Sequence, residues 1–246
     1  MEWGFFTPLH IISLLMTVGF GIGLYFLLRG RSVKVQTWVM FPMSFLGIIS
    51  MIFNIFYWPN PLENLPLHLC AFNAIVLPIA VMTKNKVLCN LLLVWCLGAL
   101  AALILNNEMS VHPFFSWPIF FYYWPHVIEF CVPILLFALG LVKKDPKCIF
   151  TTVGITLGIY TLVHFANLAI NSYAAANGIV ATQGKEYVAN YMYSLASNNP
   201  LVDLFIAVIP GGYWHMYLAI PIVVVYLLIV YAPELIRKFK KKKTAV

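Results

Sequence analysis

The sequence predicts an all-α polytopic membrane protein, a bundle of seven transmembrane helices with the N-terminus outside and the C-terminus inside. Hydrophobic residues make up 62% of the 246 residues and charged residues only 9%, against roughly 25% charged in soluble domains. Mean hydropathy is +0.90. The apolar residues also fall into runs near 20 residues long, the length that a helix needs to cross a bilayer. One integral membrane domain, residues 1–246, accounts for the whole chain.

Seven apolar runs separated by polar turns give the predicted spans. They cover residues 9–28, 37–57, 65–82, 87–105, 118–142, 148–170 and 213–231. Asn64 is the predicted N-cap of the third span. Pro66 then falls in the first helical turn, where proline is tolerated. A shorter apolar stretch, 201–209, ends at Pro210, and we expect it to be interfacial or re-entrant.

The basic residues set the predicted orientation. Fourteen of the fifteen Lys and Arg residues fall in four clusters, which lie near Arg29, Lys84, Lys143 and Arg237. The positive-inside rule places these clusters in the cytoplasm. The net charge of +7 therefore indicates attraction to anionic lipid headgroups at that face rather than binding of nucleic acid.

Histidines gather in the outer half of the predicted bundle. Ionisable groups inside a bilayer are costly and usually mark a cavity, a relay or a site. We therefore expect an outward-facing polar pocket. The six histidines are His10, His68, His112, His126, His164 and His215.

The third span carries a candidate nucleophile, Cys70. On a regular helix, residues two apart point roughly 160° away from each other, so His68 is not the expected base for Cys70. Asn73 shares the face of Cys70. Cys70 falls in the second turn of this predicted span, where the helix terminus acts only modestly on a thiol. The alternative is that Cys70 is a small buried hydrophobic residue.

The fifth span carries a candidate base. His126 and Glu129 lie one turn apart on one face, and the carboxylate would hold the imidazole in the tautomer that a general base requires. The alternative is a structural hydrogen-bonded pair between helices.

Polar residues of the sixth span and beyond have two interpretations. His164, Asn167 and Asn171 form a stripe that either lines the pocket or joins helices. Asp203 and His215 flank the break at 210–212, and either close the pocket or cap that segment.

Several short motifs point to a known family. They are Leu65-Pro66-Leu67-His68-Leu69-Cys70, Phe120-Phe121, Asn190-Tyr191-Met192-Tyr193, Leu201-Val202-Asp203-Leu204 and Tyr213-Trp214. Together they resemble the YwaF-like family of bacterial integral membrane proteins, to which animal transmembrane protein 164 is related. The animal protein is implicated as an acyltransferase acting on ether phospholipids. The resemblance implies an acyl carrier at Cys70, a histidine that activates it, and a bacterial plasma membrane location.

The residues and the resemblance together predict a lipid acyltransferase that uses a cysteine thioester intermediate and needs no cofactor or metal. The expected substrates are phospholipids or glycolipids. Asn73 and Asn190 are candidate donors to the oxyanion. The predicted catalytic residues are Cys70, His126 and His164, and the predicted substrate-binding residues are His68, Asn73, Glu129, Asn167, Asn190, Asp203 and His215.

Two other functions stay open at this point. A metal-dependent membrane lipid hydrolase would hold zinc on three histidines and a carboxylate, although no two histidines lie four residues apart. A lipid-binding or transport protein without catalysis would use the broken segment near Pro210. A transporter opens to both sides, yet the predicted cytoplasmic half is almost free of polar residues.

Overall fold

The computed structural model describes residues 3–105, 109, 112–197 and 200–243, and across these residues it is helical, with no β-strand. Val180 and Glu186 form an isolated antiparallel bridge. The all-α fold class is therefore confirmed. The two chain ends, on which the predicted orientation bears, lie outside the described residues.

The helices alternate with short connections along the chain. The described part of the chain contains three 3-10 helices, η1 (Pro61–Asn64), η2 (Tyr191–Tyr193) and η3 (Tyr213–Leu218). The α-helices of the described residues are α1 (Pro8–Leu28), α2 (Val33–Met43), α3 (Leu46–Tyr57), α4 (Leu69–Thr83), α5 (Lys86–Leu105), α6 (Trp117–Ala138), α7 (Cys148–Ala176), α8 (Pro200–Val208) and α9 (Ala219–Lys243).

Within the described residues, six helical segments are long and apolar enough to cross a membrane: α1, α2 with α3, α5, α6, α7, and η3 with the first part of α9. The chain is thus a multi-pass membrane protein. Helix α4 is apolar but has only 15 residues, fewer than the roughly 20 that span a bilayer. The seventh crossing and the orientation stay predictions.

Two predicted spans are interrupted in the structure. Pro42 lies inside the last turn of α2, and the helix restarts at Leu46 as α3 because proline lacks an N–H and clashes with the preceding turn. The last span begins as η3 and continues as α9. The predicted interfacial piece 201–209 is the separate helix α8, whose Leu204 and Val208 are exposed.

The start of α4 differs from the prediction. Its N-cap is His68 rather than Asn64, which ends η1. Leu65 is extended, with φ −62° and ψ 144°, because a residue that precedes proline is biased away from helix. Cys70 is therefore the second residue of the first turn. His68 is not helical, so the regular-helix geometry from which the divergence of His68 and Cys70 was predicted does not apply.

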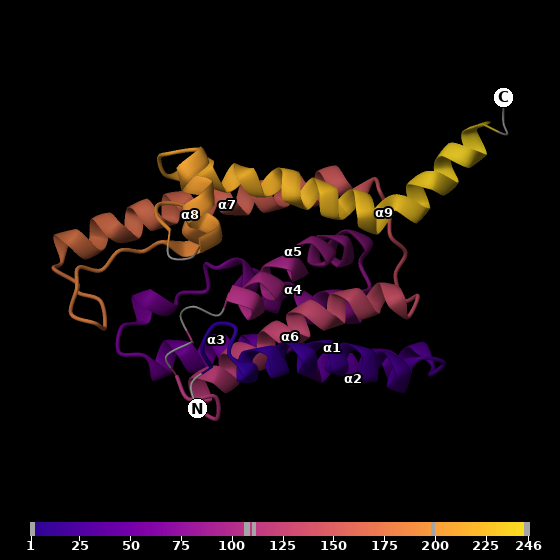
Figure 1. Ribbon diagram of the computed structural model, residues 1–246, viewed down its shortest axis with the longest axis horizontal. Coiled ribbons are helices and arrows are strands. Elements are labelled where there is room, and N and C mark those ends of the chain that lie inside the picture. Colours follow the sequence, from indigo (N-terminus) through magenta and orange to yellow (C-terminus); the bar gives the residue numbers. More distant parts are fainter. Residues whose placement is uncertain (1–2, 106–108, 110–111, 198–199, 244–246) are drawn as a thin grey trace.

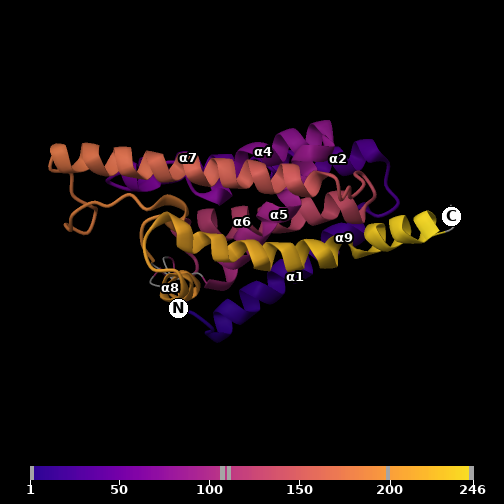
Figure 2. The same ribbon diagram turned by 90° about the horizontal axis from the view of Figure 1, so that it is seen from above.

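Helices α5 and α6 form the centre of the molecule. The largest group of fully buried apolar side chains lies on these helices and α4, and includes Leu92, Trp95 and Leu136. In Figure 1, α7 and α9 lie on one side of this centre and α1, α2 and α3 on the other. The α1–α2 turn and the C-terminal end of helix α9 lie towards the same end of the long axis in both views (Figures 1 and 2).

Candidate functional site

A cavity of about 690 Å³ lies at the end of the molecule where α4 and α6 begin. Four of the predicted site residues line it: His68, Cys70, His126 and Glu129. Most of the remaining wall is apolar and comes from α5, α7, α8 and α9. The volume is typical of sites that bind small molecules.

Contacts one turn below Cys70 set the register of α3, α4 and α6. Asn73 Nδ2 donates to the backbone carbonyl oxygen of Glu129 at 3.5 Å. Gly47 of α3 approaches both helices so closely that an added Cβ would lie 2.6 Å from Ala74 Cβ and 2.8 Å from Glu129 Oε1. Ala74 and Glu129 therefore lie at one level of the bundle.

The same register brings Cys70 and His126 to one level. Helices α4 and α6 run in the same direction, because α5 returns between them. Cys70 precedes Ala74 by four residues and His126 precedes Glu129 by three, so each lies about one 5 Å turn nearer the helix start. Both side chains line the cavity, and Cys70 is half-buried.

His126 is held in one tautomer. Its Nδ1 lies 2.6 Å from the carbonyl oxygen of Tyr122, and a carbonyl oxygen only accepts. Nδ1 therefore carries the proton, and Nε2 keeps the lone pair that a general base needs. The predicted partner was Glu129, but the orienting group is the Tyr122 carbonyl.

Glu129 turns its carboxyl group toward the cavity without a matching donor. The side chain is 3% exposed, and its Oε2 has no hydrogen-bond partner among the described residues. Asn73 is also buried, and its Oδ1 is likewise unpartnered in that part of the chain. Buried polar groups are nearly always hydrogen-bonded, so the unpartnered Glu129 oxygen marks a place in the cavity wall where a ligand or water belongs.

His68 presents the opposite tautomer. Its Nδ1 accepts a hydrogen bond from the backbone N–H of Met192 at 3.4 Å. An accepting imidazole nitrogen carries no proton, so the ring is neutral. The proton of this neutral ring is on Nε2. The cavity thus holds one histidine that accepts at Nε2 and one that donates.

A loop over the cavity, residues 187–195, forms what we call the strap. Met192 and Tyr193 of the strap line the cavity and have positive φ values of 53° and 54°. A left-handed conformation costs a residue with a side chain roughly 1–2 kcal/mol. The strap therefore needs contacts that hold it in place.

The polar stripe of α7 supplies these contacts. Asn167 Nδ2 donates to the Tyr191 carbonyl at 2.8 Å and to Ser194 Oγ at 2.9 Å, and its Oδ1 accepts from the Tyr191 N–H at 3.0 Å. His164 Nδ1 lies 3.1 Å from Ser194 Oγ. Asn171 exchanges two hydrogen bonds with the backbone of Ala189. Of the two interpretations, the stripe joins α7 to the strap and does not line the cavity.

Other predicted site residues also serve the scaffold. The side chain of Asn190 bonds the backbone of Leu195 and Ala196. His215 is fully buried, with ring nitrogens 3.1 Å from the Gly212 carbonyl oxygen and 2.7 Å from that of Tyr193. Asp203 is exposed in the first turn of α8, where a carboxylate favours the helix dipole. All three lie outside the cavity lining.

Two further histidines expected in the pocket, His10 and His112, contact the scaffold instead. His10 Nε2 lies 2.8 Å from the Leu103 carbonyl oxygen and its Nδ1 accepts from the Phe6 N–H. The His112 ring packs against Trp58, with the ring centroids 5.7 Å apart. Only His68 and His126 of the six line the cavity among the residues that the structure describes.

Sequence reasoning missed three contributors to the cavity. Gly47 permits the close approach of Glu129, Tyr122 orients His126, and Tyr193 forms part of the wall. Tyr122 precedes His126 by four residues, the spacing of a helical turn, which was a usable signal. Gly47 and Tyr193 act over long sequence separations, and no local pattern indicates their partners.

The described side chains give no ready ligand set for a metal ion. Within the described ranges, no three His, Cys, Asp or Glu side chains are close enough to share one ion. The zinc-dependent alternative therefore gains no support from this geometry.

Comparison with known families gives one match. A sequence model of the TMEM164 family matches residues 5–231. Neither the curated proteins nor the solved structures gave a match. The matched range includes the cavity, the strap and every helix up to Tyr231 in α9.

Proposed function

Because the chain belongs to the TMEM164 family, as its resemblance to transmembrane protein 164 predicted, we propose that this multi-pass membrane protein is a lipid acyltransferase. Cys70 is the acyl carrier in this proposal and His126 is its base. One observation carries it: the two side chains line one cavity at the same helical level, with the Nε2 lone pair of His126 unengaged among the described residues.

The first half of the reaction transfers an acyl group to Cys70. His126 Nε2 takes the thiol proton, and the sulfur attacks the carbonyl carbon of a lipid ester. The tetrahedral intermediate collapses with cleavage of the ester C–O bond. The leaving lyso-lipid oxygen takes the proton back from His126, and the acyl group remains on Cys70 as a thioester.

Two features near Cys70 stabilise negative charge, one on its sulfur and one on the oxygen of the attacked carbonyl. Cys70 lies in the first turn of α4, whose N-terminus has no side-chain cap, and a helix N-terminus carries a partial positive charge that stabilises anions. The neutral His68 ring has a donor at Nε2 that can stabilise the carbonyl oxygen as it becomes an oxyanion. This assigns His68 the oxyanion role expected of Asn73 and Asn190, which do not line the cavity.

The second half transfers the acyl group to an acceptor hydroxyl. The hydroxyl loses its proton to His126 Nε2 and attacks the thioester, and the Cys70 sulfur leaves and regains a proton. Glu129 lies one turn below His126, and its unpartnered Oε2 can accept a hydrogen bond from the acceptor. A bound hydroxyl would therefore give a partner to an oxygen atom that has none among the described residues.

The rest of the cavity suits a lipid. Its wall beyond the polar group is made of apolar side chains such as Leu97 and Leu100 of α5, Leu157 of α7 and Val223 of α9. Acyl chains are favoured in such a lining because apolar surface leaves water. The substrates in this proposal are phospholipids or glycolipids.

The deciding experiment looks for the thioester on the protein itself. Purified protein in nanodiscs is given a diacyl phospholipid, and its intact mass should rise by one acyl group that hydroxylamine removes. Cys70→Ala should abolish both the added mass and the transfer, with a loss on the order of 10³-fold or more. Cys148→Ala is the matched control, because Cys148 is a buried thiol outside the cavity.

Several outcomes would contradict the proposal. Full transfer by Cys70→Ala would end the cysteine mechanism. Loss of transfer on chelation would favour the metal-dependent hydrolase instead. If the thioester formed and released only free fatty acid in the presence of lyso-lipid, water would be the acceptor, and the protein would be a hydrolase.

A further inference from the structure

The end of the molecule opposite the cavity carries a second depression, of about 460 Å³. It lies between the α4–α5 turn and the α6–α7 link. Four of its residues are lysines and one is an aspartate, and Leu141 and Val142 add apolar surface. The charged residues of the depression are Lys84, Lys86, Lys143, Lys144 and Asp145.

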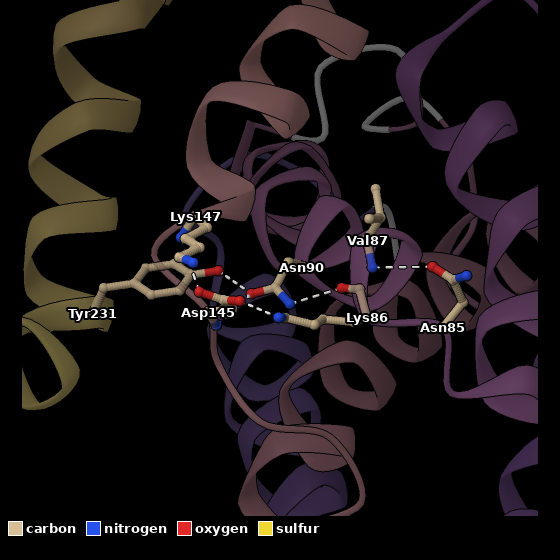
Figure 3. A network of polar contacts seen from close by, with 7 residues as sticks. All are labelled: Asn85, Lys86, Val87, Asn90, Asp145, Lys147 and Tyr231. Atoms are coloured by element: carbon tan, nitrogen blue, oxygen red, sulfur yellow. Dashed lines mark hydrogen bonds and ion pairs between the residues drawn. The ribbon is translucent and has the colours of Figure 1, made fainter.

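A polar network fixes the shape of this depression (Figure 3). Lys86 forms an ion pair with Asp145, which also accepts the backbone N–H of Lys147 at 3.0 Å. The Asp145 N–H donates to Asn90 Oδ1 at 3.4 Å, and Asn90 Nδ2 donates to the Lys86 carbonyl at 2.7 Å. The Tyr231 hydroxyl donates to the same Asn90 oxygen. The link is thereby tied to both α5 and α9.

Charge within the depression is not balanced. The negative charge of Asp145 compensates the positive charge of Lys86, and these two residues form the one ion pair among the described residues. Lys144 Nζ donates to the Val230 carbonyl at 2.9 Å, and Lys84 Nζ to the Val81 carbonyl at 3.5 Å. A carbonyl accepts a hydrogen bond but does not neutralise a charge. Three lysines, Lys84, Lys143 and Lys144, therefore line one hollow with no ion-pair partner in the described part of the chain.

We propose that this depression binds a phosphate group, supplied by the headgroup of an anionic phospholipid. Ammonium groups donate charge-assisted hydrogen bonds to phosphate oxygens, and several lysines around one hollow can bind one phosphate together. The depression lies at the ends of apolar helices that are long enough to cross a membrane, and anionic lipids attract basic residues at such helix ends. Leu141 and Val142 can contact the glycerol and the first methylenes. The proposal is independent of the acyltransferase function.

The test compares three soluble probes on the detergent-purified protein: dihexanoyl phosphatidylglycerol, dihexanoyl phosphatidylcholine and inorganic phosphate. Native mass spectrometry should show one phosphatidylglycerol bound, with at least tenfold weaker binding of phosphatidylcholine. Lys84→Gln combined with Lys143→Gln should weaken phosphatidylglycerol binding at least tenfold. Among the described residues neither lysine bonds to Asp145, Asn90 or Tyr231 of the network, so the fold should be retained.

The matched control removes the same charge elsewhere among the basic segments. Arg29→Gln combined with Arg31→Gln changes two exposed residues of the α1–α2 turn and should leave phosphatidylglycerol binding unchanged. Equal weakening by both double variants would show non-specific attraction and overturn the site. Tight binding of inorganic phosphate, with no binding of phosphatidylglycerol, would overturn the lipid source. Absence of binding by all three probes would overturn the proposal as a whole.

Discussion

The cavity and the strap are built from the same kinds of polar residue, yet their hydrogen bonding differs. At the cavity, His126 Nε2 is unengaged and Glu129 Oε2 is unpartnered among the described residues. At the strap, Asn167 and Asn190 use both their donor and acceptor atoms on protein groups. Buried polar groups normally find partners. A cavity-lining polar atom without a protein partner therefore indicates a place for a ligand, and a polar atom with such a partner indicates a role in the scaffold.

The largest expected effect contrasts two histidines. His126→Ala should lower kcat/KM for acyl transfer roughly 10²- to 10⁴-fold, the range for a general base, with little change in melting temperature. His164→Ala should lower the melting temperature, because it removes a contact to Ser194 of the strap, and should keep the rate per folded molecule. Steady-state kinetics and thermal unfolding in detergent check both. The reverse pattern would identify His164 of α7 as the general base.

A smaller effect tests the strap. Asn167→Ala should lower the free energy of unfolding by about 2–6 kcal/mol, since it removes the partners of the N–H and carbonyl of Tyr191 and each orphaned group costs roughly 1–3 kcal/mol. Thermal unfolding measures the change. Ser172→Ala is the control, because its exposed hydroxyl bonds only the preceding turn of its own helix. A neutral Asn167→Ala would mean that the strap holds without α7.

The smallest expected effect tests the packing that positions Glu129. Gly47→Ala should cost about 1–2 kcal/mol of stability, as overpacking does, because the new methyl would meet Ala74 and Glu129. It should also lower transfer, since α3 and the carboxyl must move apart. Gly154→Ala is the matched control in α7, where an added Cβ meets nothing within 4 Å. Equal stability and equal transfer rates for the two variants would show that the close approach of Gly47 to Ala74 and Glu129 is not required.

The helices were largely predictable because each apolar run carries its own signal. The start of α4 was not. Pro66 is compatible both with a first helical turn and with an extended entry, and the choice depends on contacts with the strap. The Met192 N–H reaches His68 across 124 residues, a separation that no local pattern reveals.

The polar residues show the same limit. Spacing correctly put His164, Asn167 and Asn171 on one face of α7, but it could not say what that face meets. Likewise, the i to i+3 spacing of His126 and Glu129 suggested a pair, whereas the Tyr122 carbonyl already engages His126 Nδ1. Spacing predicts which residues share a face, and only the packed structure identifies the group opposite.

The short length of α4 has a consequence for the surrounding bilayer. Fifteen residues rise about 22 Å, against a hydrocarbon thickness of about 30 Å. One face of α4 is open to lipid, since Ile75, Ile79 and Met82 are exposed. Lipids beside a short apolar surface thin locally, which would lower their ester groups toward Cys70. Hydrophobic mismatch thereby becomes a control on the proposed reaction, and transfer should slow as the acyl chains of the host bilayer lengthen.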